Sequence, residues 1–358
     1  MFNRPRLIDS SIDPIRGAET LSYRVSAECN PGATPSGYSP GPFRGVGQLT
    51  PHHASFLIRP RAPFSKGEMT ALAYQPDNIG MDAMNGTQRI RVSLAPTQRT
   101  LLLTLYARVV DAQRPAPIVN DTRAAQVLNQ VEHDPADLRS RESQQAVLLL
   151  RARQLDEWTA EFLESHPEAT ILHLACGLDS RCLRLKWGPK VRWIDVDFPD
   201  VVDLRTKVYE NPEGDYELVP ADVTDDEWLK QIPTDRPTAV VFEGLTPYLE
   251  EATGKALIRR LAEHFKTGQL IFDTVGPATV SLQLLVEPVK KAGAKFTWGV
   301  NDAEALTRLH PRLKLRDCLR PPEMKGFNHV IQPTRAFLSI YRRLPWFRNL
   351  SLCLRYDF

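Results

Sequence analysis

The chain has 358 residues, of which 42% are hydrophobic and 25% are charged, enough for one large domain or two. Its 45 basic and 43 acidic residues give a net charge of +2, which argues against a protein that coats nucleic acid. No apolar run approaches the ~20 residues that span a bilayer, so we expect no membrane partner and, with this charge, no nucleic-acid partner. The five cysteines are scattered and contain no C-x-x-C pair, so we expect no metal site and a reducing, cytoplasmic compartment.

The first 92 residues differ in composition from the rest. They hold nine of the 19 glycines and ten prolines, but none of the six tryptophans. A segment with so few apolar side chains cannot offset the entropy of ordering by burial. We therefore predict a largely disordered Gly/Pro-rich extension over residues 1–92 and a folded domain over residues 93–358. The alternative is that the first segment is a lid that covers the substrate.

Two long helices are predicted where the folded part begins. Residues 95–114 carry leucines and valine at helical spacing, and Pro115 ends the pattern. Residues 143–165 form a second helical pattern, with Trp158 and Phe162 on its apolar side. Both helices precede the first predicted strand, and we predict an N-terminal helical cap over about residues 97–132.

An alternation of buried strands and helices follows. Continuous apolar runs are typical of strands that are buried on both faces, and we predict such strands at 170–175, 191–196, 216–219, 239–242 and 269–273. A helix over residues 250–265, with Gly268 as its stop, precedes the fifth strand, and residues 313–317 and 350–356 are predicted as a closing antiparallel pair. The pattern predicts an α/β fold with a doubly wound, mostly parallel seven-stranded sheet.

Small or acidic residues follow four of these strands. Ala175 and Gly177 come after the first strand, and Asp197, Asp222 and Glu243 come after the second, third and fourth. Ligands bind at the carboxyl ends of the strands in such sheets, and Asp197 lies 20 residues beyond Gly177, a distance that suits a carboxylate on two ribose hydroxyls. The pattern favours an adenosine-like ligand, although a tight packing turn and solvated loop carboxylates are the alternatives. Neither G-x-G-x-x-G nor G-x-x-x-x-G-K-[ST] is present, so no phosphate cradle is expected.

Three segments resemble the leucine carboxyl methyltransferase-like family. They are HLACGLDSRCLR over residues 173–184, DVDFP over 195–199 and FEGLTPYL over 242–249. The residues of these motifs are most similar to the branch of tetracenomycin-type polyketide O-methyltransferases, and the resemblance covers about residues 93–358. It implies a Rossmann-like class I methyltransferase, with S-adenosylmethionine as cofactor and a small molecule as methyl acceptor.

The resemblance also implies which residues hold the amino-acid end of the cofactor. Arg151 would pair with the methionyl carboxylate, because a guanidinium suits bidentate carboxylate recognition. Glu243 would lie near the methionyl amino group. The backbone at Ala175 and Gly177 would line the methionyl and ribose parts, although the family often has glycine at position 175.

The adenosine end is assigned in the same way. Asp197 would hold the ribose hydroxyls, while Asp222 and Val223 would flank the adenine. Asp179 resembles the aspartate of the family motif, but we expect it to order the loop rather than to touch the ligand.

The sequence does not identify a general base. Tyr248 follows Glu243 and is the candidate that could face the site, with a packing aromatic as the alternative. His173 lies in the middle of a buried strand, where a structural role is expected, and His310 and His329 have no informative context.

The predicted function is therefore O-methylation of a hydroxyl or carboxyl group on a small molecule, of a polyketide-like or other secondary metabolite type. The alternatives are a methyltransferase for the C-terminal leucine carboxylate of a protein and a non-catalytic binding protein of the same fold. A serine hydrolase is not expected, because G-x-S-x-G is absent. The oligomeric state is left open.

Overall fold

The computed structural model describes residues 89–92, 95–341, 343–344 and 349–358. The predicted extension therefore lies outside the described residues up to position 88, and its disorder stays a prediction. Residues 89–92 belong to the folded part, because the Ile90 backbone pairs with the chain beside Val131: its N–H donates to the Gln130 carbonyl at 2.8 Å, and its carbonyl accepts from Glu132 N at 2.9 Å.

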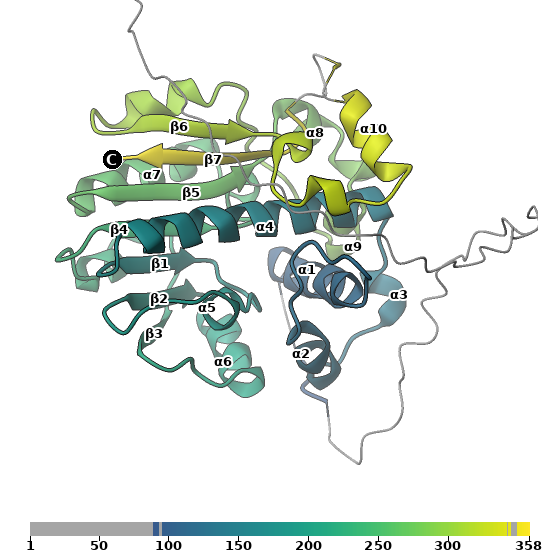
Figure 1. Ribbon diagram of the computed structural model, residues 1–358, viewed down its shortest axis with the longest axis horizontal. Helices are drawn as coiled ribbons and strands as arrows, with labels where there is room; N and C mark the ends of the chain where they lie inside the picture. The colour runs from purple at the N-terminus through teal and green to yellow at the C-terminus, as the bar shows by residue number, and fades with distance from the viewer. Residues whose placement is uncertain (1–88, 93–94, 342, 345–348) are drawn as a thin grey trace, which may run out of the picture. The chain divides into compact units, whose positions relative to one another are not determined.

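The predicted sheet is present. Its strand order is β3-β2-β1-β4-β5-β7-β6, and the strands are β1 Thr170–Leu174, β2 Arg192–Asp197, β3 Asp215–Pro220, β4 Thr238–Phe242, β5 Gly268–Thr274, β6 Lys314–Leu319 and β7 Leu352–Asp357. β1 to β5 are parallel, and β7 runs antiparallel between β5 and β6 (Figure 1). The α/β fold class is confirmed, and each parallel strand lies within one residue of its predicted bounds at either end.

Ten α-helices lie in the described part of the chain. They are α1 Pro96–Ala112, α2 Ala124–Gln130, α3 Pro135–Leu138, α4 Glu142–Ser165, α5 Arg181–Arg184, α6 Pro199–Val208, α7 Glu251–His264, α8 Pro277–Ser281, α9 Glu287–Ala292 and α10 Thr334–Tyr341. α1 and α4 correspond to the two predicted long helices. α1 begins with a proline at its first position, where the missing N–H costs no hydrogen bond. None of the described helices is long and apolar enough to cross a bilayer.

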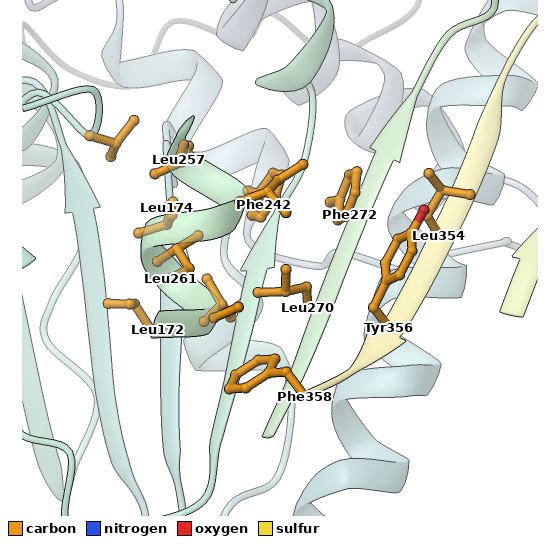
Figure 2. Packing of buried hydrophobic residues seen from close by; sticks show 14 of the residues in the cluster. Leu172, Leu174, Phe242, Leu257, Leu261, Leu270, Phe272, Leu354, Tyr356 and Phe358 are labelled. Carbon is orange, nitrogen blue, oxygen red and sulfur yellow. The ribbon is translucent and has the colours of Figure 1, made fainter. Parts of the chain in front are cut away.

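The central strands pack on both faces, as continuous apolar runs require. Ile171 of β1 belongs to the cluster with Trp158 of α4, whereas its neighbour Leu172 belongs to the cluster with Leu261 of α7. Figure 2 shows the second cluster, in which the rings of Phe242 and Phe272 stack with centroids 4.6 Å apart. The alternation of side chains along each strand thus fills the two layers on either side of the sheet.

Gly268 is not a helix stop, and this prediction was wrong. α7 ends at His264, and Gly268 begins β5. A Cβ at this position would lie 1.9 Å from the Thr238 carbonyl oxygen on β4. Glycine is therefore required here by the close approach of two strands.

The strand order places the ligand-binding edge of the sheet. From β1 the chain passes outward to β2 and β3, and it then returns to β4 on the other side of β1. Connections on opposite sides of the sheet leave a crevice at the carboxyl ends of the strands where the order reverses. The ends of β1 and β4 therefore border the expected site.

Candidate functional site

A cavity of about 580 Å³ lies at the carboxyl ends of the parallel strands. The structure brings together there all eight residues that the sequence predicts for the site, and they are Arg151, Ala175, Gly177, Asp197, Asp222, Val223, Glu243 and Tyr248. The volume is in the usual range for small-molecule sites. His310 and His329 do not line this cavity.

The turn after β1 exposes backbone to the cavity. Ala175 and Gly177 have φ values of 50° and 51°, in the left-handed region. This conformation is free for glycine but costs an alanine on the order of 1 kcal/mol. The turn is fixed to the end of β2 by Gly177, which donates its N–H to Asp197 Oδ2 at 2.7 Å.

Asp197 ends β2 and is almost fully buried. Its second oxygen, Oδ1, accepts a hydrogen bond from Phe198 N at 2.8 Å. Burial raises the pKa of the Asp197 carboxyl, although the two backbone N–H groups act in the opposite direction. Each carboxylate oxygen can accept more than one hydrogen bond. The Asp197 side chain can therefore accept further hydrogen bonds from hydroxyl groups of a molecule in the cavity.

Asp195 is the other carboxylate of β2, and its hydrogen bonds and ion pair are with residues of the protein interior. It is fully buried, accepts hydrogen bonds from Trp193 Nε1 at 2.8 Å and from Tyr216 Oη at 2.9 Å, and pairs with Arg205 at 2.7 Å. Burial alone would raise the pKa of Asp195, but Arg205 and a hydrogen bond from His173 hold this pKa at about 2. Asp195 does not line the cavity, which leaves Asp197 as the carboxylate of β2 that faces the cavity.

Asp222 and Val223 form the third strand end. Asp222 Oδ1 accepts hydrogen bonds from Thr224 N at 2.9 Å and from Thr224 Oγ1 at 2.7 Å, which fixes the turn after β3. Val223 is buried and belongs to the apolar cluster under α7. The pair thus offers one polar and one apolar contact at the same place.

Arg151 and Glu243 form a direct ion pair. Arg151 Nη2 lies 3.2 Å from Glu243 Oε1, and Arg151 Nη1 lies 2.9 Å from Oδ2 of Asp273 on β5. Asp273 is fully buried and also accepts the Gly244 N–H at 2.6 Å. Burial raises the pKa of Asp273, and Arg151 lowers it. The sequence did not single out Asp273 as a site residue, although it lies next to the end of the fifth strand and the other carboxylates lie at or just beyond the ends of theirs.

Arg181 connects Glu243 to a buried network of charges. Its guanidinium is fully buried and contacts Glu243 Oε2 at 2.9 Å, Asp156 Oδ1 at 2.7 Å and Asp179 Oδ2 at 3.2 Å. Arg181 Nη1 also lies 3.2 Å from His173 Nε2. Since a guanidinium only donates, His173 Nε2 accepts, and its Nδ1–H donates to Asp195 at 3.1 Å.

Asp179 has the ordering role that was expected. Its carboxylate accepts from Arg108 Nη1 at 2.7 Å and from Arg181 N at 3.0 Å, and it also pairs with Arg184. Three arginines hold the pKa of Asp179 well below its usual value, despite its burial. This carboxylate therefore stays charged and fixes the turn after β1, as its place in the motif beside Arg181 suggests.

The wall away from the strand ends is mostly apolar. Tyr248 lines it and packs against Phe296, with ring centroids 5.2 Å apart. Burial raises the pKa of Tyr248 to about 12, although Arg151 lowers it in part. Tyr248 therefore keeps its proton at neutral pH and can donate a hydrogen bond. No group of three or more potential metal ligands occurs among the described residues.

Comparison with known proteins gives a consistent result. A family profile described as leucine carboxyl methyltransferase matches residues 102–262. The tetracenomycin polyketide synthesis O-methyltransferase TcmP of Streptomyces glaucescens is 40% identical over 270 residues, which cover 75% of this chain and 98% of that protein. The S-adenosyl-L-methionine-dependent methyltransferase dpfgK of Gibberella zeae is 40% identical over 63% of this chain and 83% of its own length.

The comparison with solved structures gives alignments at low sequence identity. The geranyl diphosphate C-methyltransferase from Streptomyces coelicolor A3(2) is 12% identical, with a TM-score of 0.39, over 71% of this chain and 97% of that one.

Proposed function

Because the chain belongs to the leucine carboxyl methyltransferase family of S-adenosylmethionine-dependent methyltransferases, we propose that it methylates an oxygen of a small molecule, a carboxyl or hydroxyl group on a polyketide-like or other secondary metabolite. The observation that supports this most strongly is the cavity itself, where the strand-end carboxylates and Arg151 meet an apolar wall. The relative from Streptomyces glaucescens, with which the chain shares 40% identity, is a polyketide O-methyltransferase by name.

The residues present fit S-adenosylmethionine. Asp197 has acceptor capacity for the ribose hydroxyls, and Asp222 and Val223 offer a polar and an apolar contact for an adenine. Arg151 and Glu243 match the carboxylate and the ammonium of the methionyl end in charge. When bound, this cofactor supplies a methyl group that its sulfonium already activates.

The ion pair at the methionyl end can open without leaving a charge unpaired. If a ligand separates Arg151 from Glu243, Arg151 retains Asp273 at 2.9 Å and Glu243 retains Arg181 at 2.9 Å. An unpaired buried charge would be strongly destabilising. Because Asp273 and Arg181 remain as partners, Arg151 and Glu243 can separate and bind the carboxylate and the ammonium of a zwitterionic ligand end.

The acceptor side favours an oxygen that is already ionised. Among the described residues that line the cavity, the Asp and Glu side chains are Asp179, Asp197, Asp222 and Glu243, all at or just after the ends of strands. The histidine in this lining is His173, which is fully engaged, and Tyr248 keeps its proton. With no described base beside the acceptor, a carboxylate, which needs none at neutral pH, suits the site better than an alcohol.

The contribution of the protein is then mainly positioning and exclusion of water. The buried network around Arg181 fixes Glu243, and the apolar wall with Tyr248 and Phe296 confines the acceptor. Holding the reacting groups in line can supply about 7–11 kcal/mol of the barrier. Arg141 and Arg320 also line the cavity, where Arg141 pairs with Glu287 at 3.1 Å and Arg320 with Glu323 at 3.6 Å. A guanidinium has five N–H donors, so each can also donate to an anionic acceptor.

The proposed function is tested first by ligand stabilisation. We expect S-adenosylhomocysteine at 100 times its Kd to stabilise the protein by about 2.7 kcal/mol, and NAD to have no effect. The measurement is thermal unfolding with each ligand, followed by transfer of isotopically labelled methyl groups to metabolites in extracts with and without the gene. No stabilisation would contradict the cofactor site, and stabilisation without any labelled product would favour the non-catalytic alternative.

A second test separates a ligand clamp from a purely structural ion pair. We expect Arg151→Lys and Glu243→Gln each to weaken binding of S-adenosylmethionine about tenfold or more, because each removes a charge-assisted hydrogen bond. Binding of 5′-methylthioadenosine, which lacks the amino-acid end, should change far less. Calorimetric titration measures both affinities.

The control for this test is Arg153→Lys on the same helix, since Arg153 pairs with Glu157 and does not line the cavity. Equal losses for the two ligands, or a lower melting temperature with intact affinity, would show that the Arg151–Glu243 pair only stabilises the fold.

A further inference from the structure

Exposed large apolar side chains are concentrated in two segments. Of the eight in the described part of the chain, seven lie within residues 282–285 and 331–344. Leu284 is 78% exposed, Leu285 62% and Ile340 59%. Single exposed leucines are common on protein surfaces, whereas a contiguous group of them marks an interaction site.

Both segments border the mouth of the cavity. Leu282 directly precedes the 3₁₀ helix Gln283–Leu285, and Leu285 ends it. Both line the cavity, and so do Phe337 and Leu338 of α10. In Figure 1, α8, which directly precedes the first segment, and α10 lie at the same end of the sheet. We call residues 282–285 and 331–344 together the apolar collar.

The collar is also basic. Residues 331–350 contain four arginines and no aspartate or glutamate, although the whole chain has a net charge of only +2. Two of these, Arg335 and Arg343, lie in the described part of the collar. Lys290 of α9 follows the first segment, and Glu287 on the same helix is paired with Arg141. Basic side chains beside exposed leucine, isoleucine and phenylalanine are typical of elements that lie in a lipid interface.

We propose that the apolar collar docks on an anionic lipid surface, from which an apolar acceptor enters the cavity. Leu284 and Ile340 do not line the cavity, so a small acceptor alone would leave them in water. The exposed patch therefore extends beyond what one small molecule covers, and its positive charge complements anionic headgroups.

This proposal replaces the expectation from the sequence that the protein makes no membrane contact. Entry of the acceptor from lipid rests on the proposed methyl transfer, whereas the docking itself does not.

The test uses the full chain and sedimentation with vesicles of phosphatidylcholine alone or with phosphatidylglycerol. We expect binding to the anionic vesicles, and weaker binding as salt is added. Arg343→Glu should weaken binding about 30-fold, since each basic side chain near such a surface contributes about fivefold, and Leu284→Glu should weaken it about tenfold or more. Arg259→Glu on α7 is the matched control, because it makes the same charge change on an exposed helix that does not line the cavity.

The outcomes are distinguishable from a failure of the proposed function, because S-adenosylmethionine affinity is measured on the same variants and should stay unchanged. No binding to anionic vesicles, or wild-type binding by Leu284→Glu, would overturn the proposal. A concentration-dependent dimer that Leu284→Glu dissociates would assign the collar to a second copy of the chain instead. Capture of a purified acidic protein, with no binding to vesicles, would assign it to a protein partner.

Discussion

We expect Arg181→Met to lower the free energy of unfolding by about 3–5 kcal/mol, the usual effect of removing one partner from a buried ion pair. The guanidinium of Arg181 is fully buried and contacts three carboxylates and the ring of His173. Methionine fills a similar volume but leaves Asp156 and Glu243 without one of their cations. Denaturant unfolding followed by circular dichroism measures the change.

Arg153→Met is the control for Arg181→Met. Its side chain is partly exposed and pairs with Glu157 four residues along the same helix, so the expected change is below about 0.5 kcal/mol. A loss of less than about 1 kcal/mol in Arg181→Met would mean that Arg184 and Arg151 already neutralise these carboxylates, and that the network is redundant at Arg181.

Asp197→Ala should weaken S-adenosylmethionine binding by about 30- to 1,000-fold, that is by about 2–4 kcal/mol for two lost hydrogen bonds to a charged group. The structure adds a stability effect, because Asp197 also accepts the N–H groups of Gly177 and Phe198. Asp197→Asn keeps an oxygen acceptor for one of them. We therefore expect Asp197→Asn to fold more stably than Asp197→Ala while it still binds the ligand weakly.

Asp203→Ala is the matched control for Asp197→Ala, since Asp203 is an exposed aspartate on α6 outside the cavity. Calorimetric titration of folded protein gives the affinities. If Asp197→Ala binds as the wild type does, the ribose assignment is wrong. Asp195 is then no substitute, because its carboxylate is fully engaged by Trp193, Arg205 and Tyr216.

Much of the fold follows from local patterns in the sequence. The five parallel strands are continuous apolar runs, and burial on both faces is what such runs require. Among the helices that were not predicted, α3, α9 and α10 have only four to eight residues, which carry too little periodicity. In α10, Leu338 is buried while Phe337 and Ile340 are exposed, so its apolar residues do not all lie on one buried side.

The site was predictable where backbone topology determines it. Asp197, Asp222 and Glu243 follow parallel strands, so their convergence follows from the sheet. The pairing of side chains was not predictable in the same way. Arg181 meets Glu243 across 62 positions of sequence, and Arg151 meets Asp273 across 122. These pairings depend on how α4 and α5 pack on the sheet, and the spacing of residues within one segment does not predict that packing.

The place of β7 in the sheet determines when the sheet can be completed during synthesis. β7 lies between β5 and β6, yet about 80 residues of chain are made between the end of β5 and the start of β7. At about 5–20 residues per second, the ribosome needs roughly 4–16 seconds for this stretch. Until β7 has been made, β5 has no partner on that side and β6, once made, has no neighbour in the sheet. An open edge strand can pair with other chains. A chaperone that shields nascent chains therefore has its main use in this interval, after β5 has emerged and before β7 closes the gap.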